Sequence, residues 1–472
     1  MPDGAPEILE PLVQQLDAAS WSEPTERYTM DWSTKFSGSC IGVARPTTVE
    51  EVAKIVKYCY ENGIGIVPQG GHTGLCGGGT PWPNSSNIVL SLDRMNKVRN
   101  IDTDGMTMTV EAGVVLQNVQ KAALEAGCFF PLSLGAQGSC MIGGNISTNA
   151  GGVNVLKFGN TRELVLGLEV VLPDGEIYHG LKRLKKDNTG YDLKQYFIGA
   201  EGTLGVITAA TLKIFSGFVD KATAICAVPD MATSLKLLNK VRAATGDQVT
   251  AGELIHRSHI ENVTAVFETA RDPFPDPYEW YLLLEISATS KIIDIHEALE
   301  NVLGEALEEE LAIDVVIAQS EGQSQQLWDL RELLPEAGRH AGKALSHDLS
   351  VALSDVAEFH EDFIKSCREV VPDCFPMGFG HIGDGNLHVS VRPAKGKDYF
   401  DPETEAKLEE AMFACTKRFG GSFSAEHGIG QRKLPQMHAY KDAVDLKVMR
   451  AVKAALDPKG IMNPGKVLPK IH

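Results

Sequence analysis

The sequence predicts an α+β protein with more than one domain. The chain has 472 residues, too many for one ordinary hydrophobic core, which indicates two or three domains. Between residues 39 and 216, amphipathic helical segments alternate with short strands rich in β-branched residues. Near Phe218 the pattern changes to helical segments separated by longer strand-like runs, which indicates a second, mixed domain.

The first region begins with a helix whose start and buried face can both be predicted. Thr48 and Glu51 have the spacing of a capping box, which marks a helix N-terminus. The apolar residues that follow repeat as in an amphipathic stripe: Val52, Ile55, Val56 and Cys59. Strands are then predicted at residues 64–67, 88–92, 106–111 and 166–172.

The second region is predicted to hold helices at residues 231–244 and 293–303 and strands at residues 279–286 and 312–318. A further helix at residues 440–455 precedes a loop-rich end that runs to Lys466. We expect this C-terminal segment to pack back on the first domain.

Composition excludes several classes of partner and site. Forty-four basic against 62 acidic residues give a net charge of −18, which argues against nucleic acid. Nine scattered cysteines without a Cys-x-x-Cys pair indicate a reducing compartment, no structural disulfide and no thiolate zinc site. The first residues carry no signal-peptide pattern, and no run of about 18 apolar residues occurs. We therefore expect a cytoplasmic protein without a membrane span.

Two glycine-rich segments in the first region predict a cofactor cradle. The segment from Gly70 to Gly79 has six glycines in ten positions directly after a strand, so its backbone N–H groups can turn toward a diphosphate. It lacks the order G-x-G-x-x-G, so a helix dipole is not expected to hold the phosphates. The segment from Gly135 to Gly152 offers small side chains against which a large flat ligand can lie. Either segment alone could be a set of tight turns, but two in one domain favour the cradle.

Two histidines in the second region predict a divalent-metal site. His381 and His388 would lie on opposite faces of a continuous strand, but the turn-forming run 383–386 between them can bring both imidazoles together. Glu426 then supplies a third ligand and leaves coordination positions open for substrate or water. The neighbouring His427 points the other way on an extended segment and is predicted to be a general base. The alternative is a set of ordinary loop histidines, which the many adjacent glycines argue against.

Seven motifs, taken in chain order, cover nearly the whole chain: residues 68–75, 143–152, 159–163, 199–205, 380–388, 426–428 and 463–466. Together they resemble the FAD-dependent D-2-hydroxy acid dehydrogenases of the vanillyl-alcohol-oxidase type, which include the D-2-hydroxyglutarate and D-lactate dehydrogenases. The resemblance implies a two-part FAD-binding domain at residues 39–216 and a mixed α/β substrate, or cap, domain with the metal site at residues 217–430. It also implies an N-terminal extension at residues 1–38 and a C-terminal segment, residues 431–472, that returns to the flavin.

The resemblance assigns the cofactor and site residues as well. FAD is expected at Pro68, Gly70, Gly71, His72, Thr73, Gly74, Leu75, Gly135, Ser139, Gly143, Gly144, Asn145, Ser147, Asn149, Gly202, Gly205, Ile207 and Asn463. The metal ligands match His381, His388 and Glu426, and the catalytic base matches His427. Arg331 is expected to clamp the substrate carboxylate with its planar fork. Zinc is the favoured metal, with manganese and iron as alternatives.

The resemblance implies oxidation of a D-2-hydroxy acid to the 2-oxo acid. The metal is expected to lower the pKa of the substrate hydroxyl, and His427 is expected to take its proton. A hydride then passes from the substrate to flavin N5. Electrons are expected to pass to an electron-transferring flavoprotein, a cytochrome or a quinone. The oligomeric state is left open, a homodimer included. The alternatives are another flavoenzyme of this fold, such as an oxidase or an alkylglycerone-phosphate synthase, and a redox-inactive metal-binding homologue.

Three positions depart from the 2-hydroxyglutarate branch of the family. Where that branch has Thr or Ser, Lys and Asn, this chain has Pro335, Ser346 and Ser390. These changes weaken recognition of a second carboxylate, since a charge-assisted contact is worth about 1.5–3 kcal/mol. Lys343 or His347 could compensate. D-2-hydroxyglutarate, D-lactate and other D-2-hydroxy acids are therefore all candidate substrates.

Overall fold

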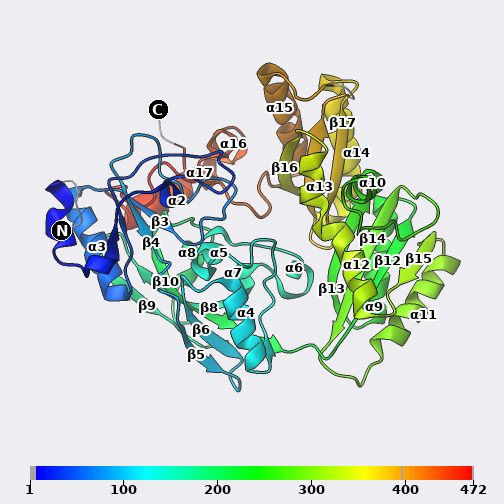
Figure 1. Ribbon diagram of the computed structural model, residues 1–472, viewed down its shortest axis with the longest axis horizontal. Helices are drawn as coiled ribbons and strands as arrows, with labels where there is room; N and C mark the ends of the chain where they lie inside the picture. Colours follow the sequence, from blue (N-terminus) through cyan, green and yellow to red (C-terminus); the bar gives the residue numbers. More distant parts are fainter. Residues whose placement is uncertain (1–6, 395–396, 470–472) are drawn as a thin grey trace. The chain divides into compact units, whose positions relative to one another are not determined.

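The structure is a computed structural model that describes residues 7–394 and 397–469. It divides the chain into two compact units (Figure 1). The first unit runs up to Gly152 and adds Gly159–Gly217 and the chain from Glu426 onward. The second unit consists of Val153–Phe158 and Phe218–Ala425.

These ranges differ from the predicted domains at three places. Residues 153–158 belong to the second unit because α6 (Val155–Phe158) packs against β13 (Val249–His256). Residues 426–430 belong to the first unit. The predicted N-terminal extension contributes Leu9, Leu12 and Leu16 to the main core of the first unit, while its residues 1–6 lie outside the described chain.

The first unit is built on two sheets. A four-stranded sheet has the order β1 (Trp21–Ser22), β2 (Gly42–Ala44), β4 (Ile88–Ser91), β3 (Ile66–Gln69), and its last three strands are parallel. A five-stranded antiparallel sheet has the order β5 (Val98–Asp102), β6 (Thr107–Glu111), β10 (Val206–Lys213), β8 (Val165–Val171), β9 (Ile177–Gly180). The short strands β7 (Cys128–Phe129) and β11 (Phe215–Ser216) pair with each other. All four strands predicted in this region form, within about two residues of the expected bounds.

The predicted capping box begins α3 (Val49–Asn62). The Thr48 hydroxyl accepts from the Glu51 N–H at 3.2 Å, and the Glu51 carboxylate accepts from the Thr47 N–H at 2.6 Å. The predicted apolar stripe is fully buried. The other helices of this unit are η1 (Glu7–Leu9), α1 (Glu10–Val13), η2 (Ala18–Ser20), α2 (Glu26–Thr29), α4 (Leu116–Glu125), α5 (Ile142–Thr148), α7 (Thr161–Leu164), α8 (Lys194–Phe197), α16 (Leu434–Tyr440) and α17 (Ala443–Leu456).

The C-terminal segment packs on the first unit through β3. The Ile66 N–H donates to the Ile461 carbonyl at 2.7 Å, and the Asn463 N–H donates to the Ile66 carbonyl at 2.8 Å. Ile461 and Met462 are both buried in the core that also contains the α3 stripe. The last residues therefore extend the edge of the sheet from which the first glycine-rich loop departs.

The second unit is one seven-stranded antiparallel sheet with helices. Its strand order is β15 (Asp314–Ile317), β12 (Asp220–Val228), β14 (Trp280–Ala288), β13, β17 (Phe375–His381), β18 (Asn386–Arg392), β16 (Leu345–Ser350). The helices are α9 (Met231–Ala244), α10 (Arg257–Val266), α11 (Ile295–Glu308), α12 (Glu321–Glu332), α13 (Leu334–His340), η3 (Leu353–Asp355), α14 (Val356–Val370) and α15 (Pro402–Arg418). The predicted helix at residues 231–244 is present with the expected bounds.

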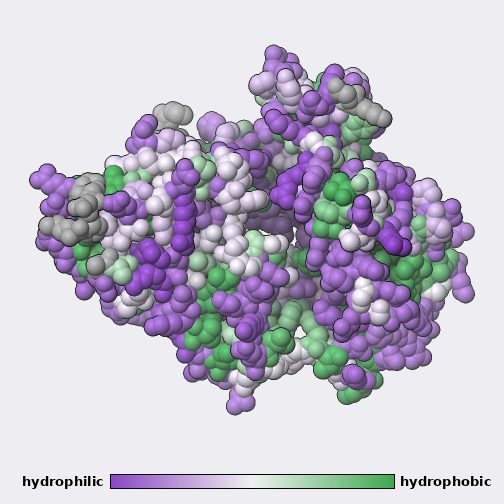
Figure 2. All heavy atoms as spheres, in the orientation of Figure 1, coloured by the Kyte–Doolittle hydropathy of each residue, from purple (hydrophilic) through white to green (hydrophobic). Residues whose placement is uncertain are grey.

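The surface agrees with the acidic, polar composition. Figure 2 shows mainly hydrophilic residues on the face drawn, with apolar residues in separate patches. All nine cysteines are buried, and none of them forms a disulfide in the part of the chain that the structure describes. In the described ranges, no helix is long and apolar enough to cross a membrane.

Candidate functional site

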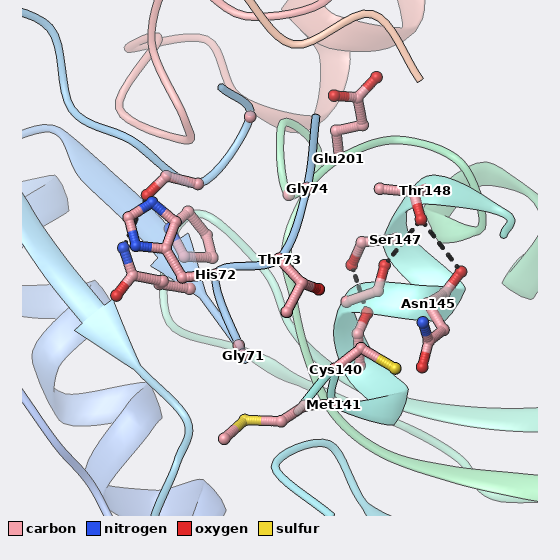
Figure 3. A pocket seen from close by; sticks show the side chains of 18 of the residues that line it. Gly71, His72, Thr73, Gly74, Cys140, Met141, Asn145, Ser147, Thr148 and Glu201 are labelled. Atoms are coloured by element: carbon pink, nitrogen blue, oxygen red, sulfur yellow. Dashed lines mark hydrogen bonds between the residues drawn. The ribbon is translucent and has the colours of Figure 1, made fainter. Parts of the chain in front are cut away.

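A pocket in the first unit is walled by two glycine-rich segments (Figure 3). One wall is the loop that leaves β3, and the other is the turn before α5 with the helix itself. The pocket holds about 1000 Å³, its open mouth included. The predicted cofactor residues that line it are Pro68, Gly70, Gly71, His72, Thr73, Gly74, Gly143, Gly144, Asn145, Ser147, Gly202, Gly205 and Ile207. His427 lines the same pocket.

The glycines of these walls allow the two segments to pack closely and leave peptide N–H groups open to a ligand. A Cβ atom on Gly71 would lie 2.1 Å from the carbonyl oxygen of Ser139, so no side chain fits there. A Cβ atom on Gly74 or Gly144 would meet nothing within 4 Å, so these positions leave open space. Bare backbone of this kind lets a ligand approach the peptide N–H groups closely. The walls therefore fit a large ligand that contains a diphosphate, such as FAD.

Five predicted cofactor residues are not among those that line the pocket: Leu75, Gly135, Ser139, Asn149 and Asn463. Some of them hold the walls in place. Asn149 ends α5 in the left-handed conformation, with φ 51°. The Asn463 side-chain amide donates to the carbonyl oxygens of Gly78 at 3.0 Å and Glu201 at 2.7 Å. These asparagines act on the pocket through the backbone that they fix.

Both ring nitrogens of His72 are engaged by the protein. Nδ1 lies 3.2 Å from the Arg27 carbonyl oxygen, and Nε2 lies 2.9 Å from the Thr80 hydroxyl. Since a carbonyl can only accept, Nδ1 carries the proton and Nε2 accepts from Thr80. Burial lowers the pKa of His72, which favours this neutral form. Figure 3 shows the ring on the side of the loop away from Asn145 and Ser147.

The buried carboxylate of Glu201 holds the loop that carries His427. Its Oε1 accepts from the Ile429 N–H at 2.6 Å, and its Oε2 accepts from the Gly430 N–H at 2.8 Å. Glu201 is 8% exposed, and this burial raises the pKa of its carboxyl in spite of the two backbone bonds. Glu201 therefore fixes the backbone immediately after His427. Sequence reasoning missed this role, because the first of these partners is 228 residues away along the chain.

β17 and β18 of the second unit bring His381 and His388 together. β17 ends at His381, the expected turn occupies residues 382–385, and the ring centroids of the two histidines lie 5.6 Å apart. Glu426 follows the last residue of this unit and offers a carboxylate oxygen. The three ligand atoms lie within 4.8 Å of one another. Two imidazole nitrogens and one carboxylate oxygen fit a zinc ion, and also manganese or iron.

A buried carboxylate on β13 orients the first of these histidines. Glu253 is fully buried, and its Oε1 lies 2.5 Å from His381 Nδ1. Burial raises the pKa of Glu253, but His381 and Arg331 outweigh that effect and hold the pKa at about 2. The ionised carboxylate accepts from Nδ1–H and leaves Nε2 of His381 for a metal. Sequence reasoning missed Glu253 because it stands in an apolar strand and its partner is 128 residues away.

Arg331 lies on α12 beside this carboxylate. Its Nε donates to Glu253 Oε2 at 2.5 Å, and its guanidinium lies 4.9 Å above the Phe379 ring. The side chain is 11% exposed. Among the described residues, no hydrogen-bond acceptor engages its two Nη groups. These Nη groups can therefore bind an anion as a planar fork.

Two of the three departures from the 2-hydroxyglutarate branch lie on neighbouring strands, and the third, Pro335, lies in the first turn of α13. Ser346 of β16 is directly opposite Ser390 of β18, and strand alternation places both on the sheet face that carries His388. His347 lies on the other face, where its Nε2 is 3.1 Å from a carboxylate oxygen of Glu409. The suggestion that His347 compensates for the missing lysine is therefore wrong.

Comparisons with known proteins show the family to which the chain belongs. The family described as FAD binding domain matches residues 41–180, and the family described as FAD linked oxidases, C-terminal domain, matches residues 219–467. Together with the glycine-walled pocket, these matches define an FAD-linked oxidoreductase.

Curated relatives narrow this class. The "Probable D-2-hydroxyglutarate dehydrogenase, mitochondrial" of Oryza sativa subsp. indica is 38% identical over 93% of this chain and 77% of its own length. The D-2-hydroxyglutarate dehydrogenase, mitochondrial, of Danio rerio is 36% identical over 93% of this chain and 80% of its own length. The chain therefore belongs to the FAD-linked D-2-hydroxy acid dehydrogenase family, as its motifs predicted.

A solved structure supports the predicted fold. An alkyldihydroxyacetonephosphate synthase matches with a TM-score of 0.73 at 16% identity, over 98% of this chain and 86% of that chain. This match shows a shared fold only, and the predicted FAD-binding fold of the vanillyl-alcohol-oxidase type is confirmed.

The expected cytoplasmic location is wrong by the same comparison, since both relatives are named mitochondrial. The expectation rested on the lack of a signal-peptide pattern. That pattern concerns secretion, and organelle targeting uses other signals.

Proposed function

We propose that this chain oxidises a D-2-hydroxy acid to the 2-oxo acid with FAD as hydride acceptor and a divalent metal as Lewis acid. The observation that carries the proposal is the group formed by His381, His388 and Glu426, whose ligand atoms lie within 4.8 Å of one another. This donor set leaves coordination positions open, as a metal that binds substrate requires. Family membership supplies the flavin half of the proposal.

The residues divide the work between binding, proton transfer and orientation. The Nη groups of Arg331 bind the substrate carboxylate in a bidentate manner. His427 accepts the proton of the 2-hydroxyl as a general base, and Glu201 holds the backbone that follows it. Glu253 keeps Nε2 of His381 directed to the metal.

The two bound groups supply chemistry that side chains lack. A metal on His381, His388 and Glu426 would lower the pKa of the substrate hydroxyl. FAD in the glycine-walled pocket would accept the hydride at N5. Substrates of the D-2-hydroxyglutarate or D-lactate type are proposed from the names of the relatives and from the motifs. An electron-transferring flavoprotein, a cytochrome or a quinone would reoxidise the flavin.

Dye-linked turnover with a panel of D- and L-2-hydroxy acids tests this proposal. The metal-replete, FAD-loaded enzyme should reduce the dye only with D-acids and should form the matching 2-oxo acid. Removal of the metal by a chelator should abolish turnover while the flavin stays bound, and added zinc, manganese or iron should restore it. Normal turnover in enzyme shown by elemental analysis to be metal-free would reject the Lewis-acid part of the proposal.

A further inference from the structure

Arg392 stands on the same sheet face as the predicted metal ligand His388. Side chains of a strand alternate between the two faces, so His388, Ser390 and Arg392 of β18 point to one side. The burial pattern agrees, because these three are partly exposed while Val389 and Val391 between them are buried. Four residues along a strand correspond to about 13 Å between the Cα atoms of His388 and Arg392.

The guanidinium of Arg392 extends from this face to the end of α13. Its Nη1 donates to the Ala341 carbonyl oxygen at 2.7 Å, and its Nη2 donates to the Gly338 carbonyl oxygen at 3.0 Å. α13 follows α12 directly, and α12 carries Arg331. The connected helices therefore have one arginine beside the predicted metal ligands and a second held at their far end.

Arg392 has no acidic partner among the described residues. Arg331 is neutralised by Glu253 at 2.5 Å, whereas the hydrogen bonds of Arg392 go only to two backbone carbonyls. The Nε atom of Arg392 is buried without a hydrogen-bond acceptor. Burial lowers the pKa of Arg392, as expected of a guanidinium shielded from water without a counter-ion.

The positive charge of Arg392 also acts on a neighbouring buried histidine. Burial lowers the pKa of His259 to about 3, and Arg392 and Arg331 are among the cations that add to this effect. His259 itself is buried and packs edge-on against Phe379, the residue opposite His388. A partly buried cation without a counter-ion is destabilising unless an anion binds it. An anionic ligand would supply the missing partner.

We propose that Arg392 binds a second anionic group of the substrate, distal to the carboxylate bound by Arg331. The substrate would then be an acidic D-2-hydroxy acid with a carboxylate at each end. This inference rests on the proposed function. Arg392 would provide the cation that is absent at Ser346. Ser346 is directly opposite Ser390, and Arg392 is two residues farther along β18 on the same sheet face. A purely structural role would be to cap the carbonyls at the end of α13.

A matched pair of substrates separates these two roles. D-2-hydroxyglutarate and D-2-hydroxyvalerate have the same carbon chain, and only the first ends in a carboxylate. Arg392→Gln removes the charge but keeps a hydrogen-bond donor for the helix carbonyls, and Arg392→Lys keeps the charge without the fork. Arg339→Gln is the matched control, because it removes an exposed cation from the same helix end.

The wild type should prefer the diacid in kcat/KM, and Arg392→Gln should lower that preference about 10- to 100-fold, mainly through KM, as the loss of one charge-assisted contact implies. Arg392→Lys should lie between, Arg339→Gln should change nothing, and Ser346→Lys added to Arg392→Gln should restore the preference. Equal losses for both acids, with a lower melting temperature, would leave only the capping role. A wild type without preference for the diacid would also overturn the inference.

A binding measurement keeps this test apart from the proposed function. Titration of the oxidised enzyme with 2-oxoglutarate and 2-oxovalerate, followed by the flavin absorbance, gives both dissociation constants without turnover. Arg392→Gln should weaken 2-oxoglutarate alone. Failure of the wild type to oxidise either of the two hydroxy acids or D-lactate would reject the proposed function. An unchanged 2-oxoglutarate dissociation constant in Arg392→Gln would reject only the role of Arg392.

Discussion

Glu201→Gln tests whether the carboxylate behind the His427 loop supports turnover. Glu201 accepts two backbone N–H groups, from Ile429 at 2.6 Å and Gly430 at 2.8 Å. The amide of glutamine keeps one acceptor oxygen, so one of the two hydrogen bonds remains, without the carboxylate charge. At the other position the amide NH₂ group faces a backbone N–H group, and both groups are donors. A charge-assisted bond is worth about 1.5–3 kcal/mol, and relief of the buried charge offsets part of its loss.

We therefore expect the loop to lose about 2 kcal/mol of stabilisation, which corresponds to about a 30-fold change in its conformational equilibrium. The variant should show a kcat lower by about tenfold, a smaller change in KM and full flavin content. The measurement is kcat over pH 6 to 9 at a temperature well below the melting transition, beside the flavin-to-protein ratio. An altered pH profile is expected, because the loop that carries His427, the proposed proton acceptor, is no longer held.

Glu169→Gln is the matched control for this experiment. Glu169 is also a buried carboxylate of the first unit, and it pairs with Arg99 at 3.1 Å and accepts from the Thr208 hydroxyl at 2.9 Å. Its replacement should lower the melting temperature without changing kcat. If Glu201→Gln behaves like this control, with normal kcat and an unchanged pH profile, Glu201 is a structural residue only.

Four further outcomes are expected. His427→Ala should keep the metal and lower turnover by about 10²–10⁴-fold, whereas His381→Ala should lose the metal but keep FAD. The metal content of both variants tests this difference. Loss of metal from His427→Ala would show that His427 is a ligand. Ser346→Lys should raise kcat/KM for D-2-hydroxyglutarate relative to D-lactate, and an unchanged ratio would exclude this position from selectivity. Acid precipitation should release all flavin, because both ring nitrogens of His72 are hydrogen-bonded within the protein and are not available for a covalent bond to the flavin. Flavin that stays in the pellet would contradict these roles of the His72 nitrogens. Burial lowers the pKa of Lys466 to about 7 in the folded chain, while the pKa of an unfolded lysine is about 10.4. The free energy of unfolding should therefore increase as pH rises from about 7 to 10. Lys466→Met should lose that dependence, and equal slopes of melting temperature against pH in both proteins would refute it.

The sequence predicts the local elements of this fold well because their signals are local. Thr48 and Glu51 are three residues apart, and the α3 stripe repeats within one helix. The glycine loops and the turn between His381 and His388 are likewise short segments whose residue types restrict the backbone. Each of these predictions depends on neighbours within about ten positions.

Contacts between distant segments carry the parts of the site that the sequence did not reveal. Glu201 and Glu253 look like ordinary residues of a motif and a strand, and their partners are 228 and 128 residues away. The role of Arg392 depends on the register of β18 and on the end of α13. Its period-two spacing from His388 was visible in the sequence, but that spacing has meaning only once residues 386–392 are known to form a strand.

Anaerobic mixing of the metal-replete, FAD-loaded enzyme with single enantiomers of 2-hydroxyglutarate and lactate tests the central claim most directly. The absorbance of oxidised flavin is followed in a single turnover, without any external electron acceptor. A D-2-hydroxy acid should bleach the flavin and yield one equivalent of 2-oxo acid, while its L-enantiomer should not. A flavin that stays oxidised with every D-acid, or that is bleached equally by both enantiomers, would contradict the proposed oxidation of a D-2-hydroxy acid.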